Sequence, residues 1–362
     1  MTLRRSRTAA ALAVGGALLL AGCATTGPVQ PYAKNATVDC GGTPTLTASG
    51  STAQANAMTR FIKTYEDACP GKTVTYTANG SGAGVEEFLN GKTDFGGSDT
   101  ALQGQEYAAA KQRCGGSDAW NLPAAFGPLA ITFNLSEVDV LTLDAPTIAK
   151  IFTGAITRWD DPALVALNGK MPALDIHVVY RSDSSGTTDN FQQYLQAASE
   201  GAWTHGAGKT FQGGTGQGAP GNQGTSEVVK NTEGAISYNE WSYAIEKELA
   251  AADIRTSAGI VHIGSDWVGK TISSVGITGQ GNDIVLDLKP IYLPTEKGAY
   301  PIVLASYEIV CSKYPDPEVG KAVKAFLHST ITAGQTGLNK SGYIPLPPDF
   351  QSKVSTAVDS IT

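Results

Sequence analysis

The chain has 362 residues and a formal net charge of −7. An acidic chain with no basic stretch lacks the electrostatic attraction that dominates nucleic-acid binding, so we expect no nucleic-acid partner. The length exceeds what one hydrophobic core usually supports, and two lobes are therefore expected.

The N-terminal residues have the pattern of an export signal. Three arginines precede an apolar run over 9–20, and small residues then lead to Cys23, which resembles the lipid-bearing residue of bacterial lipoproteins. The apolar run is shorter than the ~20 residues of a membrane span. We predict a signal peptide over 1–22, a lipidated Cys23, and a tether over 23–42 that holds an extracytoplasmic domain at the bacterial cell membrane.

Four further cysteines follow the predicted lipidation site. In an oxidising compartment an even number of cysteines favours two disulfides, and the sequence leaves their pairing open. No Cys-x-x-Cys pair or Cys/His cluster suggests a metal site, so neither a metal nor a cofactor is expected. The four are Cys40, Cys69, Cys114 and Cys311.

The first third of the mature chain alternates between extended and helical patterns. Such alternation indicates a mostly parallel sheet flanked by helices. A buried strand over 121–134 would carry the chain out of this first lobe. The elements predicted before it are strands over 45–47, 74–77 and 95–97 and helices over 53–68 and 85–89.

A second alternating stretch follows. Within it, residues 201–224 carry nine glycines and no strong periodicity, which predicts a long surface loop, and we expect little functional weight for residues 201–218. The predicted elements are helices over 147–152, 187–198 and 226–230, strands over 176–180 and 235–238, and, near the C-terminus, a strand over 301–310 and a helix over 317–330.

The sequence Arg-Ser-Asp-Ser-Ser-Gly-Thr-Thr at 181–188 predicts an anion site. A buried strand precedes it and helical spacing follows, so the segment is a turn into a helix N-terminus, whose unpaired N–H groups and positive dipole end attract oxyanions. Arg181 would add a bidentate guanidinium, and Asp183 would orient Arg181 through an ion pair. The alternative is that Ser182 to Ser185 only cap the helix.

Two turns in the first lobe have the same chemistry. Ser-Gly-Ser-Thr-Ala at 49–53 and Asn-Gly-Ser-Gly-Ala-Gly at 79–84 each lead from a strand into a helix. Ligands of open α/β sheets bind beyond the carboxyl ends of strands, although glycine turns also serve geometry alone. Three such turns in two lobes fit one buried oxyanion held in a cleft.

Asp99, in Gly-Ser-Asp-Thr at 97–100, is the unexpected group, because a carboxylate repels an anion. An ionised carboxylate can only accept hydrogen bonds, so Asp99 would accept from protonated phosphate and reject sulfate, which has no proton at neutral pH. The alternative is that Asp99 caps a helix beginning near Ala101.

These motifs, with Ile-Phe-Thr-Gly-Ala-Ile-Thr-Arg-Trp at 151–159 and Gly-Ala-Ile-Ser-Tyr at 234–238, resemble the phosphate-binding protein of the bacterial phosphate-specific ABC transporter over about residues 43–350. The resemblance implies an α/β fold of the two-lobe periplasmic-binding-protein kind, type II-like, with the ligand in the cleft between the lobes. The implied boundaries are 43–134 plus 300–362 for lobe 1 and 135–299 for lobe 2.

The resemblance also implies a binding protein rather than an enzyme, one that holds inorganic phosphate and delivers it to an ABC permease and its ATPase complex. Position 53 departs from the version with an aromatic residue there. Because the backbone N–H would make the contact, we expect a changed cleft wall rather than a lost contact. The implied phosphate-binding residues are Thr52, Ala53 through its N–H, Ser81, Asp99, Arg181, Ser185, Gly186 and Thr187.

Three alternatives stay open. Residues 264–271 match the nucleotide P-loop pattern, but the bulky Trp267 and Val268 would crowd such a loop, and we interpret the segment as a surface turn. A secreted phosphatase acting through Asp99 or Ser81 has no metal-ligand constellation or nucleophile and base to support it. A receptor for another oxyanion, sulfate or molybdate, differs from a phosphate receptor chiefly in what it requires at Asp99.

Overall fold

The computed structural model describes residues 37–362. The predicted signal peptide (1–22), the lipidation site Cys23 and the first part of the predicted tether lie outside the described residues. Within 37–362, none of the helices has both the length and the apolar character that crossing a membrane requires.

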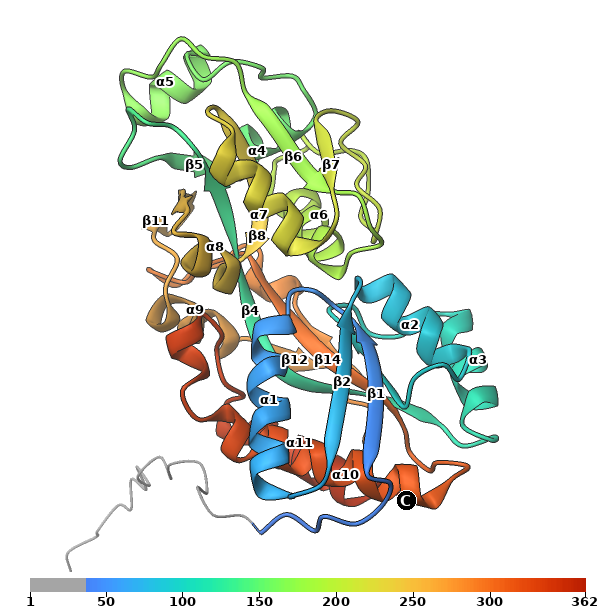
Figure 1. Cartoon of the computed structure of the whole chain (residues 1–362). Helices are drawn as coiled ribbons and strands as arrows, with labels where there is room; N and C mark the ends of the chain where they lie inside the picture. Colours follow the sequence, from blue (N-terminus) through green and yellow to red (C-terminus); the bar gives the residue numbers. More distant parts are fainter. Residues whose placement is uncertain (1–36) are drawn as a thin grey trace, which may run out of the picture. The chain divides into compact units, whose positions relative to one another are not determined.

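One nine-stranded sheet organises the described chain, and its long strand β4 runs between the two sets of outer strands (Figure 1). The strand order is β2-β1-β3-β14-β4-β8-β6-β7, with β9 paired to β4. The strands are β1 (Thr45–Gly50), β2 (Thr73–Ala78), β3 (Phe95–Ser98), β4 (Ala119–Phe133), β6 (His177–Arg181), β7 (Gln217–Ala219), β8 (Ala235–Glu240), β9 (Ala250–Ala251) and β14 (Val303–Cys311).

Strand direction divides this sheet into two parallel sets with an antiparallel centre. β1 runs parallel to β2 and β3, and β6 runs parallel to β7 and β8. β14 is antiparallel to both β3 and β4, and β4 is antiparallel to β8. The predicted mostly parallel sheet is therefore wrong at its centre. A strand supplied by a distant segment, as β14 is, need not follow the crossover geometry that makes neighbours parallel.

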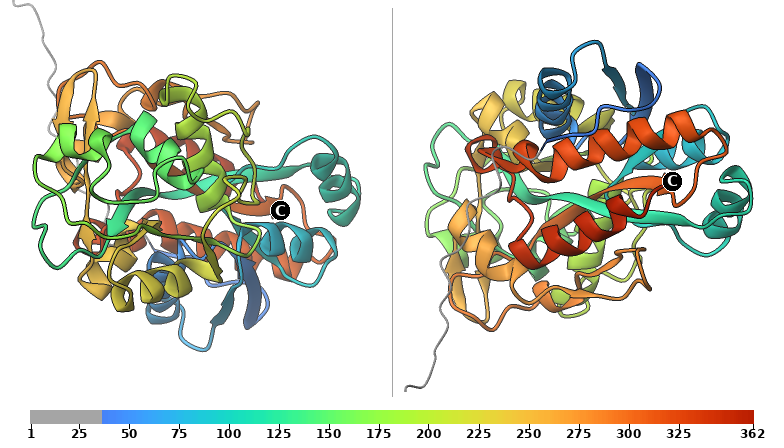
Figure 2. Two further views of the ribbon diagram at one scale, coloured as in Figure 1. Left: turned by 90° about the horizontal axis from the view of Figure 1, so that it is seen from above. Right: turned by 90° about the horizontal axis from the view of Figure 1, so that it is seen from below.

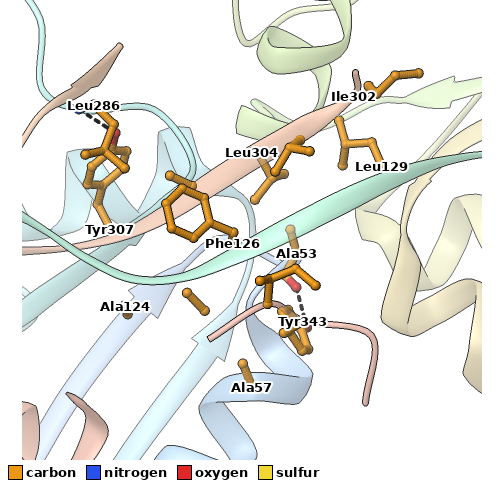
Figure 3. Packing of buried hydrophobic residues seen from close by; sticks show 14 of the residues in the cluster. Ala53, Ala57, Ala124, Phe126, Leu129, Leu286, Ile302, Leu304, Tyr307 and Tyr343 are labelled. Atoms are coloured by element: carbon orange, nitrogen blue, oxygen red, sulfur yellow. Dashed lines mark hydrogen bonds between the residues drawn. The ribbon is translucent and has the colours of Figure 1, made fainter. Parts of the chain in front are cut away.

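The core is packed around β4 and β14. All nine residues of β14 are buried, and so are all but one of the fifteen residues of β4. Figure 3 shows Phe126, Leu129 and Leu304 gathered along these two strands. Nearby, the Tyr343 hydroxyl donates to the carbonyl oxygen of Ala53 at 2.6 Å, so the core also holds the turn that follows β1.

All six predicted helices are present. Residues 37–362 contain five more helices that the sequence does not predict, and α10 and α11, near the C-terminus, pack on each other (Figure 2). The predicted helices are α1 (Ala55–Ala68), α2 (Ser81–Leu89), α4 (Ala145–Phe152), α6 (Gly186–Ala198), α7 (Gly221–Asn231) and α10 (Pro317–Ile331); the others are α3 (Gln105–Arg113), α5 (Pro162–Asn168), α8 (Trp241–Lys247), α9 (Ser265–Ile272) and α11 (Pro348–Asp359).

Two small sheets and three 3-10 turns complete the described elements. One small sheet has the order β11-β10-β5, and the other pairs β12 with β13. Their bounds are β5 (Thr142–Asp144), β10 (Asp253–Thr256), β11 (Gly259–Val261), β12 (Gly276–Ile277) and β13 (Leu286–Asp287), and the 3-10 turns are η1 (Lys289–Ile291), η2 (Ala333–Gln335) and η3 (Leu338–Ser341).

The glycine-rich segment 201–224 is more ordered than the surface loop we predicted. Its last part forms β7 and the start of α7. The Gln192 side chain donates to the carbonyl oxygens of Gly208 and Thr210 at 2.8 and 3.1 Å, and the Phe211 ring stacks on Tyr180 at 4.5 Å between centroids. The prediction missed this order because the contacts come from side chains outside the segment.

The P-loop match at 264–271 is neither a phosphate loop nor the surface turn we predicted. Helix α9 begins at Ser265, so the lysine and threonine of the pattern lie inside the helix. The Lys270 ammonium sits over the Trp267 ring at 5.1 Å, and the Thr271 hydroxyl donates to the Tyr300 carbonyl oxygen at 2.7 Å. The first contact lies within the helix, and the second attaches the helix to the segment before β14.

The four cysteines form two disulfides, as the sequence predicts, and the structure adds their pairing: Cys40 with Cys69 and Cys114 with Cys311. The first bond ties residue 40 to the end of α1, and the Thr43 N–H donates to the Glu318 carbonyl oxygen at 2.9 Å. The chain is thus attached to the folded body from Cys40 onward.

Candidate anion-binding site

Together with Ser51, the predicted site residues lie at the carboxyl ends of four strands, β1, β2, β3 and β6, or in the turns and helix starts that follow them. Ser51, Thr52 and Ala53 follow β1, Ser81 begins α2, and Asp99 follows β3. Arg181 is the last residue of β6, and the turn after it leads to Ser185 and helix α6. All eight residues proposed from the sequence are buried, and hydrogen bonds and close packing connect them into one cluster.

Arg181 is the fixed positive charge of this cluster. Its side chain is 1% exposed, and its Nε and Nη2 donate to the two carboxylate oxygens of Asp183 at 2.8 and 2.5 Å. Burial raises the pKa of Asp183, but the hydrogen bonds and charge of Arg181 and the Gly221 N–H outweigh burial and leave that pKa below its usual range. Asp183 therefore stays ionised and holds the guanidinium in place. The remaining Nη1 donates to the Thr187 hydroxyl at 3.2 Å.

Three hydroxyls in the cluster are prepared to donate. Thr187 Oγ1 accepts from Arg181 and from Asn222 Nδ2 at 3.2 Å; Thr52 Oγ1 accepts from the N–H and from Nδ2 of Asn222, both at 3.1 Å. Ser185 Oγ accepts from the Thr188 N–H at 3.1 Å and so also caps α6, as the alternative interpretation expected. Among the described residues, none of the three donates its own proton in return. Hydroxyls whose lone pairs are occupied by N–H groups present their hydrogens to a bound acceptor.

Asp99 supplies an acceptor beside these donors. Its Oδ1 accepts from Ser51 at 2.6 Å and Ser306 at 2.8 Å, whereas Oδ2 has only the Ser81 hydroxyl at 3.3 Å. Burial raises the pKa of Asp99, against the opposing effects of the three hydroxyls and the Arg181 charge. The interpretation of Asp99 as a helix cap is wrong, because the next helix begins at Gln105 after Gly104.

The N–H of Ala53 does not point freely into the cluster. It donates to the Ser51 hydroxyl at 3.0 Å, and this hydroxyl donates in turn to Asp99. The side chain of Ala53 is fully buried beneath the turn. In this structure the N–H of Ala53 thus acts through Ser51, and a bound ligand would compete with Ser51 for it.

Hydrogen bonds join the β1–β3 side of the cluster to the β6–β8 side. The Gly82 N–H donates to the Ser184 carbonyl oxygen at 2.9 Å, and Asn190 Nδ2 donates to the Asp99 carbonyl oxygen at 2.8 Å. The Tyr243 hydroxyl donates to the Thr52 carbonyl oxygen at 3.0 Å. The two sides are therefore closed upon each other in this structure.

Gly186 lies at one of the close approaches between the two sides, and we expect Gly186→Ala to hold the two sides apart. An added Cβ would lie 2.6 Å from Ser81 Oγ and 2.8 Å from Asp99 Cβ. Overpacking of this kind costs about 1–3 kcal/mol, here in the closed state, so affinity for the anion falls about tenfold. Titration calorimetry measures the loss, and small-angle X-ray scattering shows a smaller contraction on ligand addition.

The matched control is Gly269→Ala, since Gly269 lies in helix α9 with no atom within 4 Å of an added Cβ. Wild-type affinity and contraction in Gly186→Ala would contradict the closed geometry described here.

The sequence missed four residues of the cluster. Asn222 bridges Thr52 and Thr187, and Ser306 donates to Asp99 from the middle of β14. The Tyr238 hydroxyl accepts from the Arg181 N–H at 3.2 Å, and Ser51 was placed in the turn without a role. A serine inside the mostly apolar 301–310 run is a signal that could have identified Ser306. The other positions depend on contacts across the fold.

A mixed α/β fold with an oxyanion-type site between two sets of strand ends defines a solute-binding protein of the periplasmic kind. Residues 30–330 match the family profile described as a PBP superfamily domain. In the described part of the chain, no group of three or more His, Cys, Asp or Glu side chains could hold a metal.

Comparison with related proteins identifies a family within this class of solute-binding proteins. The chain is 59% identical over 370 residues to "Phosphate-binding protein PstS 3" of Mycobacterium tuberculosis, and the match covers 100% of both chains. It is 32% identical over 365 residues to "Phosphate-binding protein PstS" of Methanocaldococcus jannaschii, where the match covers 94% of this chain and 92% of that protein. The solved structure of the high-affinity periplasmic phosphate-binding protein PfluDING shares the fold, with a TM-score of 0.71 at 21% identity over 86% of this chain and 93% of that one. The chain belongs to the PstS family of phosphate-binding proteins.

Proposed function

We propose that this protein binds inorganic phosphate in the closed cluster and delivers it to an ABC permease and its ATPase complex for import. The observation that supports this most strongly is the pairing of the buried Arg181 guanidinium with the buried acceptor Asp99 in one site. A partly protonated oxyanion needs both a cation and an acceptor. The relatives that carry the name phosphate-binding protein support the same ligand.

The proposed ligand set follows from the hydrogen-bond inventory. Arg181 Nη1 and the hydroxyls of Thr52, Ser185 and Thr187 would donate to phosphate oxygens, and Asp99 Oδ2 would accept the phosphate proton. Ser81, the N–H groups of Ala53 and of Gly186 and Thr187 at the start of α6 would complete the set. Asp183 would act by orienting Arg181. This set binds and releases phosphate without a covalent step, and we propose a receptor rather than an enzyme.

We further propose the arrangement in which the receptor works. Lobe 1 would comprise residues 43–134 and 300–362, lobe 2 residues 135–299, and the lobes would close on phosphate as a hinge. Lipidation at Cys23 would keep the protein at the outer face of the cell membrane, close to the permease. Because the lobes would close on the anion, the permease could recognise the phosphate-bound protein by its closed conformation.

Phosphate uptake by cells tests this function. The full-length chain is expressed with the permease and ATPase of its own genome in a bacterium lacking its phosphate-binding protein, and uptake of radiolabelled phosphate is measured. Uptake is expected with the wild-type chain. It should fall with Cys23→Ala, which should also move the protein from the membrane to the soluble extracytoplasmic fraction. Tight phosphate binding by the purified protein without uptake would contradict the delivery role.

A further inference from the structure

A buried carboxyl group lies beneath the candidate site without a partner. Glu308 is on β14, two residues after Ser306, so both side chains point to the same face of the strand. Glu308 is fully buried, and among residues 37–362 neither of its carboxyl oxygens has a hydrogen-bond partner. Buried polar atoms almost always have one. Glu308 therefore requires an explanation.

The neighbouring Gln54 provides it. Gln54 is also fully buried, and its Oε1 likewise lacks a partner, while its Nε2 donates to the Tyr76 hydroxyl at 3.0 Å. An ionised Glu308 could only accept hydrogen bonds, so it would leave Gln54 Oε1, which is itself an acceptor, without a donor. A protonated Glu308 can donate its O–H to Gln54 Oε1 and satisfy both residues. Burial raises the pKa of Glu308 to about 8; Gln54 opposes this shift and the charge of Asp99 adds to it.

The surroundings of Glu308 contain few groups that titrate. Asp99 approaches from the end of β3 and Tyr76 from β2, and burial keeps the pKa of Tyr76 well above its usual range. The residues opposite Glu308 on the neighbouring strands are Gly97 on β3 and Leu122 on β4, neither of which titrates. Asp99 is thus the charge with which an ionised Glu308 would interact.

A chain of hydrogen bonds connects Gln54, the neighbour of this acid, to the anion cluster. Gln54 donates to Tyr76, the Tyr76 hydroxyl donates to the Ser51 carbonyl oxygen at 2.8 Å, and Ser51 Oγ donates to Asp99 at 2.6 Å. Ser51 and Gln54 enclose the turn that carries Thr52. The protonation state of Glu308 therefore affects both the position of this turn and the charge near Asp99.

We propose that Glu308 is a positioning residue that holds the Gln54–Tyr76–Ser51 chain as an uncharged acid, and that loss of its proton to solvent in alkaline solution weakens phosphate binding. This proposal rests on the proposed function. An ionised Glu308 would add a second carboxylate near Asp99 in a medium of low dielectric, where like charges repel strongly. It would also remove the donor to Gln54.

Glu308→Gln tests the proposal, because its uncharged amide still donates to Gln54 Oε1. Phosphate titrations of wild type and variant from pH 6 to 9.5 are compared as a ratio of dissociation constants, which cancels the ionisation of phosphate itself. We expect a ratio near one at pH 6.5 and at least fivefold weaker wild-type binding at pH 9.5. Parallel pH profiles would overturn the proposal. Glu318→Gln, an exposed residue paired with Lys321, is the matched control.

A second variant and a phosphate-free measurement separate this proposal from the proposed function. Glu308→Leu removes the donor as well as the charge, so it should weaken phosphate binding at every pH, and Glu308→Gln should restore binding. In the phosphate-free protein, the folded state keeps a proton that the unfolded state loses between the ordinary value of 4.5 and about 8. Wild-type stability therefore falls as the pH rises through this window.

The Tm advantage of Glu308→Gln should grow from pH 5 to pH 8. The infrared band of protonated carboxylic acids at pH 6.5 should be weaker in the variant, with the remainder coming from Glu240, another buried glutamate whose pKa burial raises. A constant Tm difference with an unchanged infrared band would overturn the uncharged acid. A growing Tm difference without phosphate binding would instead retain the acid and reject the proposed function.

Discussion

Arg181→Ala is expected to weaken phosphate binding by roughly 100-fold or more. The variant removes the buried cation. It also leaves the carboxylate of Asp183 without the two guanidinium nitrogens that donate hydrogen bonds to it. In the complex, phosphate would also lose its buried cation; removing one partner of a buried, hydrogen-bonded charge pair across a binding interface costs about 2–5 kcal/mol or more, and 1.4 kcal/mol corresponds to a tenfold change in affinity. Titration calorimetry of the purified, phosphate-stripped variant measures the loss, and circular dichroism verifies its fold.

Two further variants make the Arg181 experiment specific. Arg158 forms ion pairs with Asp160 and Asp175 at the surface, so Arg158→Ala should leave phosphate binding unchanged. Arg181→Lys keeps the positive charge but loses the planar guanidinium that binds Asp183 with two hydrogen bonds, and it should recover only part of the affinity. Near wild-type binding by a folded Arg181→Ala variant would refute the role of this guanidinium.

The second large effect is expected on selectivity. Asp99→Asn should reduce the preference for phosphate over sulfate at least tenfold. In the wild type, a sulfate ion would leave Asp99 Oδ2 without a proton to accept and would face its charge; an unpaired buried acceptor costs about 1–3 kcal/mol. An asparagine amide is uncharged and can donate to either anion. Competition of sulfate against phosphate in calorimetric titrations measures the ratio.

Asp118→Asn is the matched control for this experiment, because Asp118 is an exposed carboxylate paired with Lys111. It should leave the phosphate to sulfate ratio unchanged. An unchanged ratio in Asp99→Asn would remove Asp99 as the selectivity determinant and would favour a general oxyanion receptor.

Local sequence patterns predicted those parts of the site that local chemistry determines. A strand end followed by hydroxyl and glycine residues and then by helical spacing identifies a turn such as 181–188 without knowledge of the fold. The proposed Arg181–Asp183 pair, two residues apart, also needed no tertiary information, and the structure contains it. Asn222 and Ser306 escaped because their roles arise from contacts with residues 170 and 207 positions away along the chain.

In the fold, too, local patterns were predicted and long-range pairing was not. The apolar runs at 121–134 and 301–310 predicted buried strands, but nothing within either run specified that β4 and β14 lie antiparallel at the centre of the sheet. The helical spacing of the buried residues Val268, Thr271 and Ile272 in α9 coincides with the P-loop pattern, which by itself predicts a loop at this position. Strand pairing and helix burial are decided by long-range packing, which a single sequence records only weakly.

The most direct test of the receptor is a calorimetric titration of the phosphate-stripped protein, lacking residues 1–22, with phosphate and then with sulfate at neutral pH. We expect tight one-to-one binding of phosphate and no heat from sulfate. Equal binding of both anions, or no heat from phosphate, would contradict the proposed phosphate receptor.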